Sequence, residues 1–126
     1  MMIRHTIALL SCFFSSHIFA DSCFHTQSKN NIVNCDIDEG FSAGSRVVDL
    51  KIKDQSYKIK YESCQNELTE TGCSKAEIQI NQSAMVKAKS YIRDGSTKNI
   101  IPEQQWNSNI YDCAKSSNGK IDICWK

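Results

Sequence analysis

The chain has 126 residues, of which 40% are hydrophobic and 23% charged, with seven cysteines and one proline. This composition excludes a disordered tail, a collagen and a coiled coil, and the length is that of one domain. Fifteen Lys and Arg against 14 Asp and Glu give a formal net charge of +1. Because nucleic-acid-binding proteins usually carry a strong positive field, we expect no nucleic-acid partner.

Residues 1–20 have the pattern of a secretory signal peptide. A single arginine, Arg4, precedes an apolar run that ends at Phe19, and the small residue Ala20 is followed by polar residues. The run is shorter than the roughly 20 apolar residues that a transmembrane helix needs, and no other segment approaches that length. We predict cleavage after Ala20 and export of residues 21–126, as a single disulfide-linked β domain, to the periplasm or the extracellular space.

A lipid anchor is the competing interpretation of this leader. The run Leu9-Leu-Ser-Cys12 resembles a bacterial lipobox, which would place a lipid on Cys12. Lipobox signals usually end their apolar region before the cysteine, whereas this run continues to Phe19. We therefore favour the cleaved signal peptide.

Cleavage would remove 20 of the 126 residues and one of the seven cysteines, which leaves 106 residues and six cysteines. An even number of cysteines in a short exported chain predicts a disulfide framework. Because folding of so short a chain buries only about 60–65% of its surface, the crosslinks would supply much of the net stability. The expected pairs are Cys113 with Cys124, Cys23 with Cys35 and Cys64 with Cys73, and crossed pairs such as Cys35 with Cys64 stay open.

The first predicted hairpin covers residues 48–62. Its apolar residues alternate with charged ones, and are Val48, Leu50, Ile52, Tyr57, Ile59 and Tyr61. A turn at Asp54-Gln55 places Ile52 opposite Tyr57, Leu50 opposite Ile59 and all six apolar side chains on one face. The other face then carries four lysines, which are Lys51, Lys53, Lys58 and Lys60. In this register Lys51 lies opposite Lys58, a like-charge pair.

Residues 76–92 also alternate, which favours one long bent strand or two strands in succession. A short helix over residues 82–93 is the rival interpretation, because apolar residues recur there every four positions and Gly95 would cap the helix. After a turn at Asp94-Gly95, residues 97–101 are expected to return as a strand.

The dipeptide Asn118-Gly119 predicts a second hairpin, because both central residues of a type I′ turn need positive φ. A turn centred there places Cys113 opposite Cys124, and Lys115 opposite Asp122. The expected fold is therefore mainly β, a small antiparallel sandwich or barrel stabilised by disulfides, with a short helix at residues 82–93 as an open alternative.

The predicted secreted chain contains few groups suited to catalysis. His25 is its only histidine, and we expect it on a surface strand or loop. Oxidised cysteines provide neither a nucleophilic thiolate nor a zinc site. The acidic run at residues 36–39 lacks the spacing of a calcium loop. We predict no catalytic residue, no metal and no cofactor.

Two surface features are candidates for binding. The lysine face of residues 48–62 either protects a strand edge or docks an acidic partner. Glu67 and Glu70 lie between Cys64 and Cys73, where a disulfide would hold a loop rigid and reduce the entropy lost on binding, as suits an inhibitor.

The function that we predict is that of a small exported, non-catalytic binding protein, an inhibitor or immunity-type protein acting on another protein outside the cytoplasm. The alternative is a small secreted hydrolase or toxin that uses Glu67, Glu70 or His25, since paired carboxylates occur in glycosidases. A carbohydrate-binding module is the third hypothesis.

Overall fold

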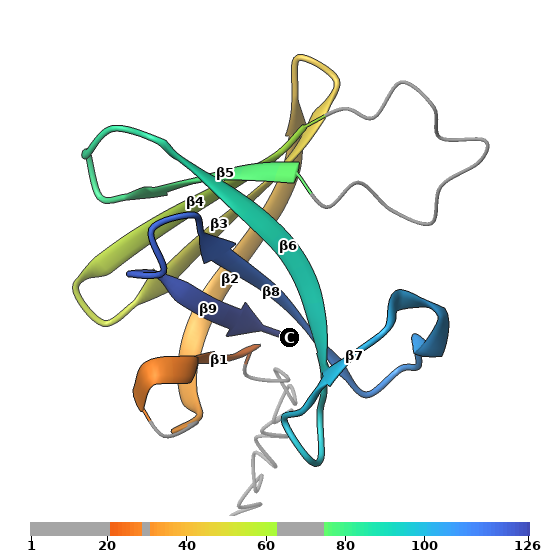
Figure 1. The fold of residues 1–126 in the computed structure, drawn as a ribbon. Helices are drawn as coiled ribbons and strands as arrows, with labels where there is room; N and C mark the ends of the chain where they lie inside the picture. Colours follow the sequence, from red (N-terminus) through yellow and green to blue (C-terminus); the bar gives the residue numbers. More distant parts are fainter. Residues whose placement is uncertain (1–20, 29–30, 63–74) are drawn as a thin grey trace, which may run out of the picture.

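The computed structural model describes residues 21–28, 31–62 and 75–126 (Figure 1). The predicted signal peptide and the predicted pair Cys64 with Cys73 lie outside these residues. In the described ranges, no helix has the length and hydropathy needed to cross a membrane.

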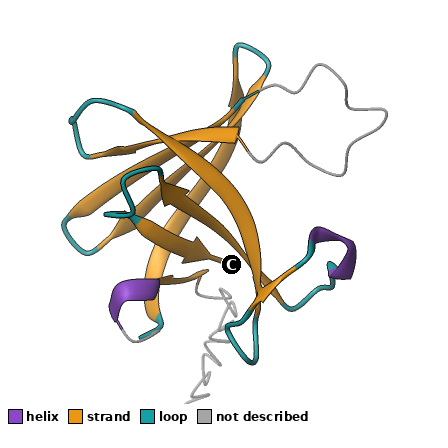
Figure 2. Ribbon diagram, in the orientation of Figure 1, coloured by secondary structure: helices purple, strands orange, loops and turns teal. Residues whose placement is uncertain are grey.

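The described residues form nine β-strands and two short 3-10 helices (Figure 2). In chain order they are β1 (Asp21–His25), η1 (Thr26–Ser28), β2 (Val33–Ser42), β3 (Ser45–Ile52), β4 (Gln55–Tyr61), β5 (Lys75–Ile80), β6 (Val86–Asp94), β7 (Ile100–Ile101), η2 (Glu103–Gln105), β8 (Ile110–Ser116) and β9 (Asp122–Trp125).

The strands form one antiparallel sheet that closes on itself. Their order is β5-β4-β3-β2-β1-β9-β8-β6-β7, and β5 also pairs with β6. This extra pairing joins the two sides of the sheet into a barrel, so that only the two-residue β7 remains outside the ring, attached to β6 (Figure 1). The predicted mainly β, disulfide-stabilised fold is confirmed, and of the two predicted architectures the barrel is the one formed.

The barrel interior contains the main hydrophobic core. Alternate residues of a strand point to opposite faces of a sheet, so each strand contributes every second side chain to the interior. A barrel of about eight strands is just wide enough for side chains to fill it. The buried residues of this core are Cys23, Cys35, Val48, Leu50, Ile52, Tyr57, Ile59, Ala76, Ile78, Ala88, Ala114, Ile123 and Trp125.

The predicted hairpin of residues 48–62 is present as β3 and β4, but its predicted register is wrong by two residues. Leu50 faces Tyr57 rather than Ile59. The turn is formed by Lys53 and Asp54, and Lys53 has a φ of 54°. Left-handed backbone is rare for lysine, so this turn position could not be predicted from the residue types. Because the shift is an even number of residues, the apolar side chains still share the interior face.

The alternating residues 76–92 form two strands in succession, β5 and β6, which is one of the two extended arrangements predicted. The helix considered for residues 82–93 does not form. The chain reverses between the strands at Asn81, whose φ is 52°, and β6 then pairs with β5 on one edge and with β8 on the other. These hydrogen-bonded ladders favour the extended backbone over a helix.

The predicted C-terminal pairing is confirmed, because Cys113 faces Cys124 and Lys115 faces Asp122. The predicted type I′ turn is wrong, since Gly119 has a φ of 73° while Asn118 is not in the left-handed region. The Gly119 amide instead donates to the Ser116 carbonyl at 2.9 Å, and a longer loop connects the strands.

Two of the predicted disulfides are present. Cys23–Cys35 joins β1 to β2 inside the barrel, and Cys113–Cys124 joins β8 to β9. The second bond lies on the outer face, where it packs with Phe24 and Tyr111. Both bonds crosslink strands that are already neighbours, so they reinforce the ladder near the point where the last strand meets the first.

Candidate functional site

The β2–β3 hairpin extends past its neighbours at one end of the barrel. β1 pairs with β2 only from Val33 to Cys35, and the pairing of β4 with β3 ends at Val47. Figure 1 shows the turn of this hairpin projecting at the top of the molecule. We call residues 39–46 the hairpin tip.

The turn of the hairpin tip is tight. Ser42 faces Ser45, and the two residues between them, Ala43 and Gly44, have φ values of 50° and 79°. Two consecutive residues with positive φ are the feature of a type I′ turn, whose twist matches that of the flanking strands. The tip is therefore a regular two-residue hairpin.

Phe41 is the most exposed large apolar residue of the described chain, with 82% of its surface accessible. A single exposed apolar residue is common on soluble proteins and by itself needs no explanation. Phe41 differs in its position, because it lies one residue before a tight turn on a projecting hairpin. Aromatic side chains in such positions are typical anchors of protein interfaces.

Arg46 holds the hairpin tip against the barrel. It lies opposite Phe41 in the ladder, and its Nη2 donates to Glu39 Oε1 at 2.8 Å. The guanidinium also lies 4.9 Å from the ring centre of Tyr61 and 3.9 Å from Asp112 Oδ2. These contacts connect β2, β3, β4 and β8, so that the tip is braced by strands on both sides of the barrel.

Burial controls the protonation of the groups around Arg46. It raises the pKa of Tyr61 well above its usual range, and the positive charge of Arg46 opposes this shift. Burial also raises the pKa of Asp112, again opposed by Arg46. The guanidinium therefore favours the charged form of a carboxylate that desolvation disfavours.

The four predicted lysines do not form one basic surface. Lys51 and Lys58 line a groove of about 400 Å³ on the outer face, which we call the charged groove. The same groove contains three carboxylates, those of Asp36, Asp38 and Asp49. Asp49 faces Lys58, in place of the predicted pair of two lysines. The groove thus carries charges of both signs.

The other two lysines lie elsewhere. Lys60 is on the outer face between Val47 and Glu77. Lys53, in the β3–β4 turn, lines a second pocket of about 480 Å³ at the end of the barrel opposite the hairpin tip. Lys53 therefore does not lie on the outer face of the hairpin, where the sequence pattern predicted it.

His25 also lines this second pocket. It is half-buried at the end of β1, with its Nε2 3.4 Å from the Tyr57 hydroxyl, and burial lowers its pKa. The sequence predicted a surface strand or loop for His25; the residue ends a strand and is less exposed than predicted. Glu67 and Glu70 lie outside the described residues. Across residues 21–28, 31–62 and 75–126, no group of three or more His, Cys, Asp or Glu side chains is arranged to hold a metal ion.

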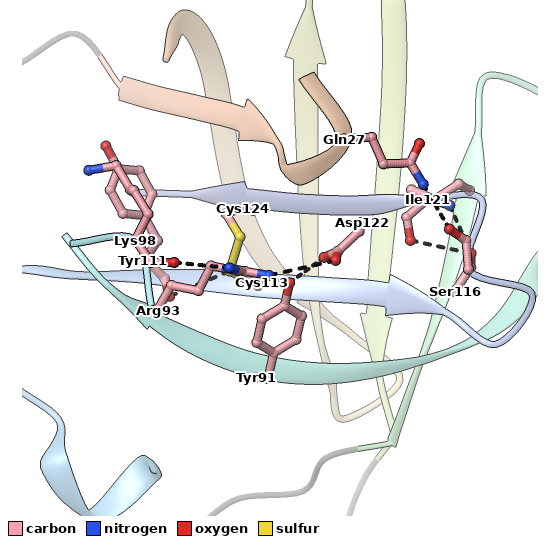
Figure 3. Close-up of polar contacts among 11 residues, drawn as sticks. Gln27, Tyr91, Arg93, Lys98, Tyr111, Cys113, Ser116, Ile121, Asp122 and Cys124 are labelled. Carbon is pink, nitrogen blue, oxygen red and sulfur yellow. Dashed lines mark hydrogen bonds and ion pairs between the residues drawn. A yellow bond between two sulfur atoms is a disulfide. The ribbon is translucent and has the colours of Figure 1, made fainter. Parts of the chain in front are cut away.

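A further polar cluster lies on the outer face over β6, β8 and β9 (Figure 3). The Tyr91 hydroxyl donates to Asp122, and Arg93 Nε donates to that hydroxyl at 3.1 Å. Burial and the Asp122 carboxylate raise the pKa of Tyr91 to about 12. Asp122 is only 7% exposed and has both Tyr91 and Arg93 as partners, so this cluster connects strands β6 and β9.

Sequence reasoning missed the hairpin tip. The dipeptide Ala43-Gly44 between two alternating stretches was the available signal, but the alternation before it ends in charged residues and Gly40. The proximity of Arg46 to Tyr61 and Asp112 could not be read from the sequence, because it depends on closure of the barrel.

No protein-family model, curated protein or solved structure matches this chain.

Proposed function

We propose that this chain is a small exported, non-catalytic binding protein that inhibits or neutralises another protein outside the cytoplasm. The hairpin tip is the part that contacts the partner, and Phe41 is its anchor. The observation that carries this proposal is the 82% exposure of Phe41 on a projecting hairpin that Arg46 braces.

The energetic argument favours binding at this position. Burying a phenylalanine side chain contributes about 1.5–3 kcal/mol. A tip that is already ordered by its type I′ turn and by the Arg46 contacts loses little conformational entropy when it binds. A rigid protrusion of this kind inserts into a concave surface, such as the cleft of an enzyme or a toxin.

Export is supported by the pattern of residues 1–20 and by the disulfides. Two disulfides in a chain of this size are compatible with an oxidising compartment. The hydrolase or toxin alternative relied on Glu67, Glu70 or His25. It stays a prediction, because Glu67 and Glu70 lie outside the described residues and nothing tests a catalytic role of His25.

The charged groove is a second candidate surface. The sequence suggested an acidic partner for the lysines. A groove that carries positive and negative side chains instead fits a partner surface with charges of both signs. Lys51 and Lys58 have no ion-pair partner within 4.0 Å in the described part of the chain. They are therefore available to a carboxylate of the partner.

The test is affinity capture from culture medium or periplasmic extract with immobilised secreted protein, its Phe41→Ser variant and its Trp106→Ser variant. Trp106 is the matched control, because it is an aromatic residue of 67% exposure outside the hairpin tip. We expect the Phe41 variant to retain about tenfold less of a specific protein, and the Trp106 variant to retain as much as the unmodified chain. Equal retention by all three proteins would contradict the role of the tip.

A further inference from the structure

We propose that the partner binds by strand addition: an extended segment with alternating basic and apolar residues pairs with the edge of β2 next to Phe41. This inference rests on the proposed function, since it describes how the hairpin tip holds its partner. It adds main-chain hydrogen bonds and a charge pattern to the apolar contact of Phe41.

The edge of β2 from Asp36 to Ser42 is open in the described part of the chain. One edge of β2 pairs with β3 along all of these residues. On the other edge, pairing with β1 stops where Asp21 faces Cys35, and no other described strand takes its place. In the secreted chain that the sequence predicts, Asp21 is the first residue, so β1 cannot extend further along this edge. We call this stretch the open edge.

The register shows which main-chain groups point to the open edge. Across a two-residue turn, Ser42 and Ser45 form a hydrogen-bonded pair, and such pairs alternate with non-hydrogen-bonded ones along an antiparallel ladder. The even-numbered residues of this stretch therefore bond to β3. The amide and carbonyl groups of Ile37, Glu39 and Phe41 point away from β3.

One hydrogen bond supports this assignment. The Ile37 amide donates to Asp21 Oδ2 at 3.2 Å. A side-chain carboxylate thus occupies the position where the carbonyl of a neighbouring strand would lie. The next two outward-pointing residues, Glu39 and Phe41, have no main-chain partner on this side among the described residues. They offer two donors and two acceptors to an incoming strand.

The open edge lacks three of the features that usually prevent strand addition. Edge strands are commonly protected by lysine, proline or a bulge, and residues 36–42 read Asp-Ile-Asp-Glu-Gly-Phe-Ser. There is no lysine or proline in this stretch, and its ladder with β3 is continuous. At Gly40 no atom lies within 4 Å of the position that a Cβ would occupy, so the outer face of the sheet is uncovered at this residue.

The charges near the open edge determine which kind of segment can pair with it. Asp36 and Asp38 project from the outer face next to the edge, and Glu39 projects from the opposite face. A second copy of this chain would bring the same carboxylates against them, which is unfavourable. A segment with lysine or arginine at alternate positions would instead face Asp36 and Asp38, and its apolar residues would lie on the side of Phe41. Pairing of this kind is the recognition mode in which main-chain bonds give affinity and alternate side chains give specificity.

The experiment uses the oxidised secreted protein and two synthetic peptides, acetyl-Lys-Val-Lys-Val-Lys-Val-Lys-amide and its counterpart with glutamate in place of lysine. Amide hydrogen exchange of the protein is measured by NMR with each peptide at millimolar concentration. We expect the basic peptide to slow exchange at Glu39 and Phe41 at least tenfold, with no such effect of the acidic peptide. Unchanged exchange at both amides would overturn the proposal.

A matched pair of variants separates the main-chain contact from the side-chain contact. Glu39→Pro and Glu39→Ala both remove the carboxylate that binds Arg46, but only the proline removes an amide donor at the open edge. We expect Glu39→Pro to bind the basic peptide at least tenfold more weakly than Glu39→Ala. Equal binding by the two variants would overturn strand addition.

Other outcomes are also decisive. Slow exchange at Glu39 and Phe41 without peptide, together with a dimer in sedimentation analysis, would mean that a second copy occupies the edge and would overturn the proposal. If capture depends on Phe41 but the basic peptide does not bind, the proposed function stands and strand addition fails. If the peptide binds but capture does not depend on Phe41, the proposed function fails.

Discussion

Cys113 and Cys124 lie directly opposite each other on β8 and β9, with their Cα atoms 4.1 Å apart. Their disulfide is on the outer face of the barrel, because the flanking pair Ala114 and Ile123 belongs to the interior core. The bond therefore closes the C-terminal hairpin (Figure 3). It also packs with Phe24 in the outer cluster.

The first prediction concerns this bond. Replacing both Cys113 and Cys124 with alanine should lower the free energy of unfolding by about 3 kcal/mol, because the crosslink closes a loop of about a dozen residues in the unfolded chain. Equilibrium denaturation in urea measures the change. A loss of less than about 1 kcal/mol would mean that the strand ladder alone holds the hairpin.

The second prediction concerns Arg46. Arg46→Gln should raise the pKa of Asp112, because the positive charge that opposes the effect of burial is removed. The cost in stability should be about 1 kcal/mol at pH 7, since these ion pairs are partly exposed. Carbon-detected NMR titration of the Asp112 carboxyl checks the shift. A fall in the pKa of Asp112 would contradict this arrangement of charges. Asp94 is the control residue, because it lies at the end of β6, away from the contacts of Arg46.

The third prediction concerns pH. Burial lowers the pKa of His25 below its ordinary value of 6.5 in the folded state. Below about pH 6.5 the unfolded chain therefore takes up a proton that the folded chain does not, so folding stability falls as pH decreases until the folded pKa is reached, and is unaffected by this group at higher pH. His25→Gln should remove this part of the pH dependence. Denaturation midpoints of both proteins between pH 7.5 and 5 measure it, and parallel curves would contradict it.

The fourth prediction compares two glycines of the β2–β3 hairpin. Gly44 has a φ of 79°, whereas Gly40 is in extended backbone, and a Cβ at either would have no neighbour within 4 Å. Gly44→Ala should destabilise by about 1 kcal/mol through backbone strain alone, and Gly40→Ala should be neutral or slightly stabilising. Thermal unfolding checks both. Equal effects would show that the turn does not depend on its left-handed glycine.

Local pattern predicted strands β3 to β6 and the pairing of β8 with β9, but it did not predict β1 or β2. The alternation of Val48, Leu50 and Ile52 identified the core face of β3, and the position of Asn118-Gly119 identified the pairing of Cys113 with Cys124. The β3–β4 register was missed because Lys53 adopts a left-handed backbone that its side chain does not favour. The error was harmless to the core because a shift by two residues keeps the same face inside.

The parts of the site that depend on distant contacts could not be predicted. Closure of the barrel joins β1 to β9, so Cys23 lies opposite Trp125 at the far end of the sequence. The same closure brings Asp112 to Arg46, two residues that no local pattern relates. Exposure of Phe41 follows from where β1 begins and β4 ends relative to the β2–β3 hairpin, which is a property of the assembled sheet.

We propose that the chain matures outside the cytoplasm as an oxidised barrel beginning at Asp21, and the open edge next to Phe41 depends on that start. The intact mass of the secreted protein shows whether it begins there. We expect the mass of residues 21–126 less the hydrogens of six cysteines, all of them paired. A full-length or lipid-modified chain, or one with unpaired thiols, would contradict it.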